Sequence, residues 1–305
     1  MKPKIAISIG DLNGVGLEIA LKSHDEVSKL CSPIYCTNYT MLHQGAKLLN
    51  LELPNDLQLH ELDGEFRIEP GKVNKESGLY SYNSFMEAIK LCETKEADAV
   101  VTMPIHKEAW KLSNLNFVGH TDLLRKYFNK EAIMMLGCPQ MFVALFTEHM
   151  PLKEVPLHIT FENISNFLFD LHKSLGDVEV AVLGLNPHAG DNGVLGNEER
   201  EIERAIAHVN KTLAKELFHG AIVPDIAFTS SFRKNFNYYV AMYHDQGLAP
   251  LKALYFDESV NISLNLPIVR TSVDHGTAFD IAYTNKASNL SYLNAIKSAL
   301  NFINN

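Results

Sequence analysis

The sequence is poor in cysteine, in tryptophan and in positive charge. Its 305 residues include 4 Cys and 1 Trp, and 27 Lys and Arg stand against 36 Asp and Glu, a formal net charge of -9. Nucleic acids and anionic membrane surfaces bind clustered positive charge, so this balance disfavours both as partners. The cysteines have neither a paired CxxC spacing nor the density of a secreted disulfide scaffold, and we expect reduced, buried thiols.

Long apolar runs are also missing. No stretch approaches the roughly 18 uninterrupted apolar residues of a membrane-spanning helix. The first apolar run, Ile5–Ile9, ends at Gly10 and is too short for the hydrophobic part of a signal peptide. We therefore expect a cytoplasmic protein without a membrane partner. Its 46% hydrophobic content is enough for a large core, and there is no internal repeat or low-complexity tract.

Short buried runs alternate with longer segments of helical periodicity, a pattern that predicts an α/β fold with mostly parallel sheets covered by helices. The predicted strands are IAISI, PIYCT, DAVVTM, AIMML, MFVALF, VEVAVLGL, YYVAMY and PIVRTSV. The predicted helices span residues 80–96, 163–175, 197–217 and 289–303.

Most of these strands end in a short polar segment that contains Gly or His. The segments are SIGDLNGVG, VVTMPIHK, LFTEHMP, GLNPHAGDNGVLG, AMYHDQG and IVRTSVDHG. Ligands of open parallel sheets bind at the carboxyl ends of the strands, so these segments are expected to meet in one crevice.

Histidines lie just past the strand in LFTEHMP, GLNPHAGDNGVLG and AMYHDQG, namely His149, His188 and His244. Three imidazoles that leave one coordination position open are typical of a catalytic metal site. Each of them alone would more often be an ordinary surface or core histidine. Asp245 is expected to orient an imidazole or to act as an acid or base, with a helix cap as the alternative.

Other segments offer sites for anions. Gly10, Gly14 and Gly16 lie between a strand and a helix, where backbone amides can bind a phosphate, although GxxxGxG also fits an ordinary tight turn. GHTDLLRKYF places His120 and Thr121 at a predicted helix start, either to bind an anion or, for Thr121, to cap the helix. Positive charge near these segments is sparse and comes from Lys107, Lys252 and Arg270, for which a solvated charge is the default interpretation.

Five ordered motifs, GHTD, GLNPHAG, YHDQGL, VNISLNLP and RTSVDHGTAFD, closely resemble the 4-hydroxythreonine-4-phosphate dehydrogenase (PdxA) family of vitamin B6 biosynthesis. GDLNGVG and TMPIHKEA are also similar to this family, so the resemblance covers nearly the whole chain. Leu12 departs from the family pattern, which usually has proline there, and so do PDIAF and the short segment near residues 217–223.

The resemblance implies a fold of two α/β/α lobes like that of isocitrate and isopropylmalate dehydrogenases. The first lobe would comprise residues 1–118 and 271–305 and the second residues 119–270, with the active site in the cleft between them. The resemblance also implies a homodimer with shared active sites, in which one metal ligand comes from the partner.

The implied reaction is NAD- or NADP-linked oxidation of 4-phosphohydroxy-L-threonine, followed by decarboxylation to 3-amino-2-oxopropyl phosphate, a step towards pyridoxine 5'-phosphate. One divalent cation, zinc, magnesium or cobalt, would be held by His149, His188 and His244, which with Asp245 form the predicted catalytic set. The implied substrate contacts are His120, Thr121, Lys252, Asn261 and Arg270. We predict cofactor contacts at Gly10, Asp11, Gly14, Gly16, Asn186, Asp274 and His275.

Three alternatives remain at this point. A paralogue could oxidise another phosphorylated hydroxy acid. A metal-dependent phosphohydrolase would use similar residues, but it should need carboxylates that bridge two metals, and the histidine segments have few acids. A non-catalytic binding module is disfavoured by the three intact histidines. SVDHGTAFD also has a simpler interpretation as a helix start capped by Ser or Asp.

Overall fold

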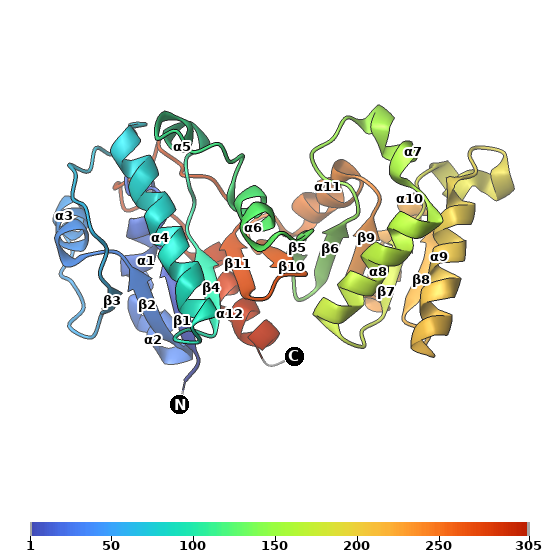
Figure 1. Ribbon diagram of the computed structural model, residues 1–305, viewed down its shortest axis with the longest axis horizontal. Coiled ribbons are helices and arrows are strands. Elements are labelled where there is room, and N and C mark those ends of the chain that lie inside the picture. Colours follow the sequence, from blue (N-terminus) through green and yellow to red (C-terminus); the bar gives the residue numbers. More distant parts are fainter. Residues whose placement is uncertain (1, 304–305) are drawn as a thin grey trace. The chain divides into compact units, whose positions relative to one another are not determined.

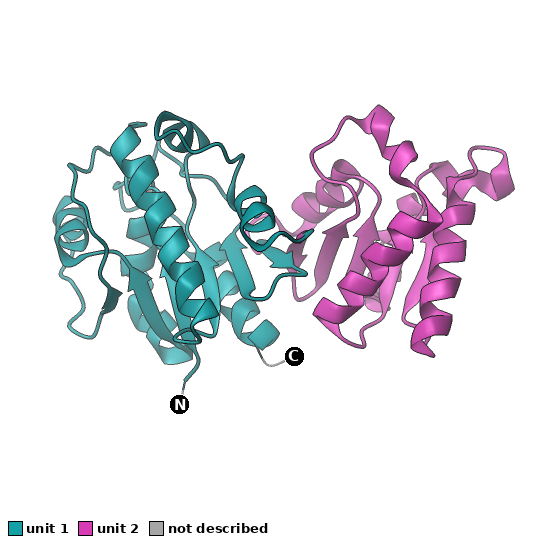
Figure 2. Cartoon of the chain, viewed as in Figure 1, with its two compact units in different colours: residues 1–131, 260–305 teal, residues 132–259 magenta. Residues whose placement is uncertain are grey.

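The computed structural model describes residues 2–303. The chain forms two compact units, unit 1 with residues 1–131 and 260–305 and unit 2 with residues 132–259 (Figure 2). The lobes predicted from the sequence had other boundaries, since residues 119–131 and 260–270 lie in unit 1.

Unit 1 contains a mostly parallel set of strands. They are β1 (Lys4–Ser8), β2 (Ser32–Cys36), β3 (Gln58–His60), β4 (Ala99–Thr102), β10 (Val260–Leu264) and β11 (Val269–Val273). Their order is β3-β2-β1-β4-β11-β10, and each neighbouring pair is parallel except β10 and β11, which are antiparallel. The carboxyl ends of β1, β4 and β11 therefore lie side by side.

Helices cover both faces of these strands. They are α1 (Gly16–Lys22), α2 (His24–Leu30), α3 (Tyr39–Leu49), α4 (Lys75–Glu93), α5 (Lys107–Leu112), α6 (His120–Phe128) and α12 (Leu290–Ile303). Figure 1 shows α4 in front of β1, β2 and β4, and α12 behind the strands. On the α4 side, Phe85, Val100 and Trp110 are fully buried in one apolar cluster.

Unit 2 has the same construction. Its strands are β5 (Ile133–Cys138), β6 (Met141–Leu145), β7 (Val180–Leu183), β8 (Phe218–Ile222) and β9 (Tyr238–Ala241). They lie in the order β5-β6-β9-β7-β8, and β5 with β6 is the antiparallel pair. The carboxyl ends of β6, β9 and β7 are thus neighbours.

The helices of unit 2 also lie on both faces, with α8 and α9 in front of the strands in Figure 1 and α11 behind them. They are α7 (Val155–His158), α8 (Phe161–Leu175), α9 (Glu198–Leu213), α10 (Pro224–Ala227) and α11 (His244–Tyr255). Short 3-10 turns occur at Leu152–Glu154, Pro187–Gly193 and Phe232–Lys234. Val143, Ala241 and Leu251 belong to the core on the α11 side.

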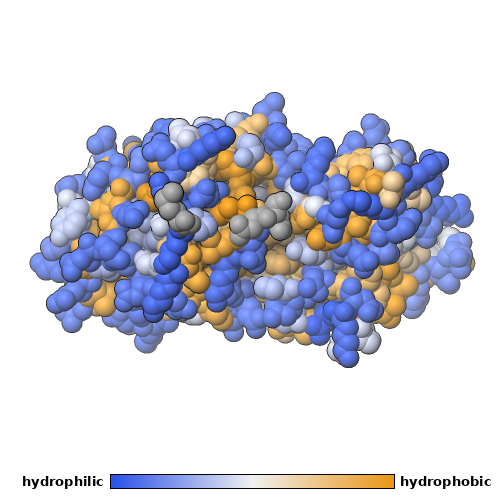
Figure 3. All heavy atoms as spheres, turned by 90° about the horizontal axis from the view of Figure 1, so that it is seen from below, coloured by the Kyte–Doolittle hydropathy of each residue, from blue (hydrophilic) through white to orange (hydrophobic). Residues whose placement is uncertain are grey.

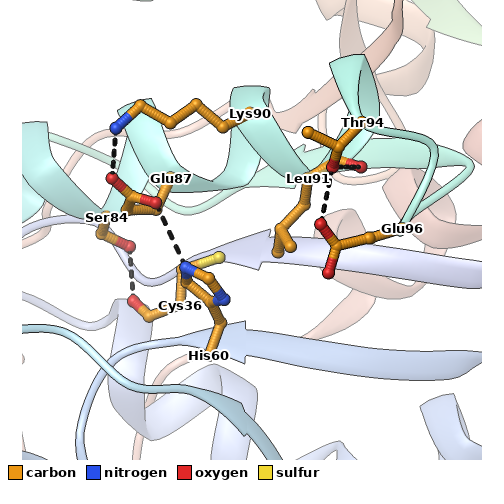
Figure 4. A network of polar contacts seen from close by, with 8 residues as sticks. All are labelled: Cys36, His60, Ser84, Glu87, Lys90, Leu91, Thr94 and Glu96. Atoms are coloured by element: carbon orange, nitrogen blue, oxygen red, sulfur yellow. Dashed lines mark hydrogen bonds and ion pairs between the residues drawn. The ribbon is translucent and has the colours of Figure 1, made fainter.

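Side-chain hydrogen bonds fix α4 on the strands of unit 1. Ser84 Oγ donates to the Cys36 carbonyl at 2.7 Å and accepts from the Ile9 amide at 2.9 Å, so it joins the ends of β2 and β1. Figure 4 shows the nearby pairing of His60 and Lys90 with Glu87, at 3.2 and 2.6 Å. These contacts hold the β1 end, and with it the segment that begins at Gly10, against α4.

The α/β fold predicted from the sequence is confirmed, and each of the eight predicted strands overlaps one in the structure. The four predicted helices correspond to α4, α8, α9 and α12. Two alternatives were wrong. No helix starts at 272–280, because α12 begins only at Leu290, and the N-cap of α6 is Gly119 rather than Thr121.

On the face in Figure 3, hydrophilic residues predominate and the apolar areas are interrupted by them. Among residues 2–303, no helix combines the length and the apolar character needed to span a membrane.

Candidate functional site

The polar segments expected to form the site are divided between the two units. Those that follow β1, β4 and β11 lie at one edge of unit 1, and those that follow β6, β9 and β7 lie at one edge of unit 2. Strand order produces this grouping, because parallel neighbours present their carboxyl ends at the same edge. Each unit therefore has its own set of candidate residues.

Arg270 is the buried cation of unit 1. Its side chain extends from β11, and the residue is 2% exposed. Nη1 donates to Asn261 Oδ1 at 3.3 Å and to Ser263 Oγ at 3.1 Å, and Nη2 donates to Thr102 Oγ1 at 2.7 Å. All three acceptors are neutral.

The Nε atom of Arg270 is buried and has no hydrogen-bond partner among the described residues, and no carboxylate there pairs with the guanidinium. Burial lowers the pKa of Arg270 to about 9, so the group is still charged at neutral pH. A buried charge without a counter-ion is costly, and a bound anion would offset that cost. The guanidinium is therefore suited to a carboxylate or phosphate group.

His120 belongs to the same neighbourhood. It is the first residue of α6, and its ring packs edge-on against Phe85, with centroids 4.6 Å apart. Burial holds the pKa of His120 well below its usual value, and the positive charge of Arg270 lowers it further. The imidazole is thus neutral at pH 7, and its buried Nε2 has no partner among the described residues.

The start of α6 adds further groups to this neighbourhood. Thr121 is the second residue of the helix, and no side chain caps the helix start. The Lys107 side chain lies beside Gly119, since its Cε would be 3.9 Å from a Cβ at that position. Free amides at a helix start and a nearby ammonium both favour an anion. His120, Thr121, Asn261 and Arg270, all predicted substrate contacts, therefore lie in one unit, on α6 and two adjacent strands.

The glycine-rich segment after β1 packs against its own chain. Gly10 has φ +71°, and a Cβ there would lie 2.4 Å from the Pro104 carbonyl oxygen. A Cβ at Gly14 would lie 2.7 Å from the Thr277 carbonyl oxygen. These close approaches explain glycine at both positions without a bound phosphate, and at Gly16 a Cβ would likewise meet the backbone, at Ile9.

Asp11 is fully buried within this segment. Its carboxylate accepts hydrogen bonds from the Asn13 amide at 2.9 Å and from Ser77 Oγ at 3.2 Å. Burial raises the pKa of Asp11, whereas both hydrogen bonds lower it. The contacts observed for this carboxylate thus stabilise the turn after β1.

Asp274 and His275 follow β11 at the same edge of unit 1. The Asp274 amide donates to Ser291 Oγ at 3.0 Å, which joins the segment to α12. His275 Nδ1 lies 2.9 Å from the Gly276 carbonyl oxygen, while its Nε2 is buried without a partner among the described residues. This nitrogen is available for a ligand.

In unit 2, two of the three predicted metal ligands lie together. The ring centroids of His149 and His244 are 5.4 Å apart. His244 is the first residue of α11, and its Nδ1 donates to Asp245 Oδ1 at 2.8 Å. A proton on Nδ1 leaves the lone pair on Nε2, the arrangement in which a carboxylate orients a metal-binding imidazole. Asp245 lies in the first turn of α11 and caps nothing with its side chain.

His188 is exposed in the loop after β7, on the strand end next to that of His244. Its φ of 53° and that of Ala189, 50°, are in the left-handed region, which costs free energy for residues other than glycine. The buried Glu199 holds the start of the loop, because its Oε1 accepts from the amides of Leu185 and Asn186 at 2.9 and 2.7 Å.

The Asn186 side chain makes hydrogen bonds to two glutamates that follow the same loop. Its Nδ2 donates to Glu198 Oε2 at 2.7 Å and to Glu199 Oε2 at 3.0 Å. Both donor hydrogens of this amide are therefore occupied, and the cofactor contact predicted for Asn186 remains a prediction.

The structure does not gather a complete metal-binding set in one place. Among residues 2–303, no three His, Cys, Asp or Glu side chains are grouped closely enough to hold a metal ion. His149 and His244 nevertheless fit two positions of a nitrogen ligand set, with His188 on the adjacent loop. Lys252 lies on α11, with its Nζ 5.4 Å from the Phe256 ring centroid, and so belongs to unit 2, unlike the other predicted substrate contacts.

Four side chains that support these residues are not indicated by the sequence motifs. Thr102 and Ser263 bind Arg270, while Glu199 and Gln246 bind the ends of loops that carry histidines. All four lie within or next to motifs that were singled out. Their partners, however, are backbone groups or residues on other strands, which sequence spacing does not reveal.

Comparison with known proteins gives a consistent result. The family described as "Pyridoxal phosphate biosynthetic protein PdxA" matches residues 29–299. A 4-hydroxythreonine-4-phosphate dehydrogenase of Sulfurimonas denitrificans is 64% identical, over 98% of this chain and 97% of the relative. One from Campylobacter fetus subsp. fetus is 56% identical, with the same coverage of each chain. The crystal structure of the Klebsiella pneumoniae enzyme of that name superposes with a TM-score of 0.85 at 29% identity, covering 100% of this chain and 99% of that one.

Proposed function

Because this chain belongs to the PdxA family, we propose that it oxidises 4-phosphohydroxy-L-threonine with NAD or NADP in pyridoxine 5'-phosphate biosynthesis. The chain is an enzyme, a dehydrogenase of this family. In the proposed reaction, the carbon that bears the hydroxyl group gives a hydride to the nicotinamide, and the hydroxyl group gives up its proton. The resulting β-keto acid loses carbon dioxide to leave 3-amino-2-oxopropyl phosphate.

The observation that best supports an anionic substrate is the buried guanidinium of Arg270 with neutral partners only. Thr102, Ser263 and Asn261 fix the orientation of the guanidinium but leave its charge uncompensated. His120, the first residue of α6, is close enough for the charge of Arg270 to lower its pKa, and the Lys107 side chain lies beside Gly119 at the same helix start. We propose that these groups bind an anionic group of the substrate, which would enable this acidic protein to hold a phosphate ester. Lys252 of unit 2 is proposed as a further contact.

Three histidines of unit 2 offer nitrogen ligands for a divalent cation. We propose His149, His188 and His244 as its ligands, with Asp245 orienting His244 through the 2.8 Å hydrogen bond. When bound, zinc, magnesium or cobalt would supply Lewis-acid chemistry, which favours ionisation of an alcohol and polarises a ketone. The role of each chain is to hold its imidazoles in place for the ion, with one ligand of each site coming from the partner.

The nicotinamide cofactor supplies the hydride acceptor, so the protein has to bind and orient it. We propose that the segments after β1 and β11 contribute, with Gly10, Asp11, Gly14, Gly16, Asp274 and His275, and that Asn186 adds a contact from unit 2. His275 is the best supported of these, because its buried Nε2 has no partner among the described residues.

We further propose that the enzyme is a cytoplasmic homodimer with shared active sites, as the family resemblance implies. Light scattering coupled to size-exclusion chromatography tests the dimer directly. A monomer that is fully active at assay concentrations would contradict shared sites.

One assay tests the proposed reaction. Purified protein is incubated with 4-phosphohydroxy-L-threonine, NAD+ or NADP+ and one divalent metal at a time, and the absorbance of the reduced cofactor is followed. Reduction that depends on both substrate and metal is expected. No reduction with any metal would overturn the assignment.

The same samples distinguish the alternatives. Release of inorganic phosphate without cofactor reduction would favour a phosphohydrolase. Reduction with another phosphorylated hydroxy acid, but not with this one, would favour a paralogous dehydrogenase.

A further inference from the structure

Two side chains join the ends of the three strands that precede the histidines. Thr147 Oγ1 donates a 2.6 Å hydrogen bond to the Met242 carbonyl oxygen. Gln246 Oε1 accepts from the Met242 amide at 2.7 Å, and Gln246 Nε2 donates to the Gly184 carbonyl oxygen at 2.7 Å. Both backbone polar groups of Met242 are therefore bound by side chains from other positions.

The residues joined by these hydrogen bonds precede the three histidines by only a few positions in the sequence. Thr147 precedes His149 by two residues, Met242 precedes His244 by two, and Gly184 precedes His188 by four. Because β6, β9 and β7 are parallel neighbours, the hydrogen bond from Thr147 crosses from β6 to β9. The bonds of Gln246 cross from β9 to β7. Together they form a polar clamp, defined by Thr147 and Gln246.

The surroundings protect these hydrogen bonds from competition by water. Thr147 is 4% exposed and Met242 is fully buried, so water has little access to compete for the bonds. Gly184 is buried too, and its own amide donates to Ile222 on the next strand at 2.8 Å. The carboxamide of glutamine has both an acceptor for the Met242 amide and a donor for the Gly184 carbonyl, and it carries no charge.

We propose that Gln246 and Thr147 are positioning residues that set the spacing of the loops bearing His149, His244 and His188. This inference rests on the proposed function, in which imidazoles at these three positions, one of them from the partner, bind one cation. Outer contacts of a metal site typically change its affinity about 10–100-fold when they are removed. The clamp acts one step further out, through the backbone that carries the ligands.

The test uses the full-length protein with Co²⁺ alone as the probe. Gln246→Met removes both hydrogen bonds of the carboxamide. Gln246→Glu keeps the acceptor for Met242 and replaces the donor to Gly184 with a charged oxygen. Thr147→Val removes only the bond between β6 and β9. The same two glutamine changes at Gln140, which is exposed in the turn at the other end of β6, are the matched controls.

Three quantities are measured for each variant: the Co²⁺ dissociation constant, the melting temperature of the cation-free protein, and the ¹⁵N signals of the three histidine rings. Gln246→Met and Gln246→Glu are expected to weaken Co²⁺ binding at least tenfold and to move the His188 signals. Thr147→Val should move the His149 and His244 signals more than those of His188. The Gln140 variants should match the wild type in all three quantities.

Unchanged Co²⁺ affinity and unchanged His188 signals in both folded Gln246 variants would overturn the proposal. If the wild type binds no divalent cation, the metal part of the proposed function fails, and the ring signals alone decide on the clamp. Movement of the His188 and His244 signals then supports it, and their constancy refutes it. Should Gln246→Met not fold, Gln246→Glu, which keeps the acceptor for Met242, supplies the same comparison.

Discussion

Arg270 Nη2 donates a 2.7 Å hydrogen bond to Thr102 Oγ1, which joins β11 to β4 across 168 positions of the sequence. This hydroxyl helps to hold a buried guanidinium that has no carboxylate partner among the described residues. Natural proteins seldom keep such an uncompensated charge without a use for it. The first prediction follows from this contact.

Arg270→Lys should raise the KM for the phosphorylated substrate at least tenfold. Lysine keeps the charge but loses the planar fork that now contacts Thr102, Ser263 and Asn261. A hydrogen bond to a charged group contributes about 1.5–3 kcal/mol, which corresponds to a tenfold or larger effect. Steady-state kinetics of the two proteins measure the change.

The matched control is Arg204→Lys. Arg204 lies on α9, and its side chain is 63% exposed in an ion pair with Glu201. The same substitution there should leave KM unchanged. An Arg270→Lys enzyme with the KM of the wild type would show that the guanidinium does not contact the substrate.

The neutral state of His120 predicts a pH dependence of stability. Burial and Arg270 hold the pKa of His120 well below the value of about 6.5 that histidine has in an unfolded chain. As the pH falls below about 6.5, the unfolded chain gains a proton at this residue while the folded chain does not. The free energy of unfolding therefore falls by up to about 1.4 kcal/mol per pH unit on this account.

His120→Asn removes this titration. Melting temperatures of the wild type and the variant, measured from pH 7.5 to 5.5, should converge or cross as the pH falls, because only the wild type loses the contribution. His158→Asn, an exposed position on α7, is the control and should change the pH profile little. A constant difference between wild type and His120→Asn would refute a depressed pKa at His120.

Most of the predicted strands are compact runs of buried apolar residues, as in Ile133–Cys138, although Val269–Val273 also contains Arg270, Thr271 and Ser272. The three strands without a prediction lack that character. Gln58–His60 has only three residues and none is buried, Phe218–Ile222 contains His219 and Gly220, and Val260–Leu264 includes Asn261 and Ser263. Backbone pairing with a neighbour makes these segments strands, and a single sequence does not show that neighbour.

Strand order decides which candidate residues lie at the same sheet edge. The six polar segments were expected to meet in one crevice, and strand order places three of them at one edge of each unit. The family resemblance implied Asn261 and Arg270 as substrate contacts, and their side chains are hydrogen-bonded to each other at 3.3 Å. It gave no indication of Thr102 or Gln246, whose importance comes from the groups across the sheet that they bind.

His188→Ala should abolish turnover and weaken divalent-cation binding at least tenfold, because it removes one of three proposed ligands. Isothermal titration with Zn²⁺ and the cofactor-reduction assay measure the two effects separately. His158→Ala is the control, since His158 is also exposed and belongs to the same unit. Wild-type activity in His188→Ala would remove this histidine from the mechanism.

Gly10→Ala tests whether the glycine-rich segment after β1 is required by packing or by a bound phosphate. A Cβ at Gly10 would lie 2.4 Å from the Pro104 carbonyl oxygen, at a φ of +71°. Clash and backbone strain together should destabilise the cofactor-free protein by more than about 1–3 kcal/mol, the usual cost of strain alone. Gly64→Ala separates the backbone strain from the steric clash, because Gly64 has φ +99° and a Cβ there would meet nothing within 4 Å. Urea unfolding of the cofactor-free proteins should therefore give a much lower free energy of unfolding for Gly10→Ala than for Gly64→Ala. If Gly10→Ala is as stable as Gly64→Ala but binds NAD(P)+ more weakly, the glycine serves the cofactor instead of the fold.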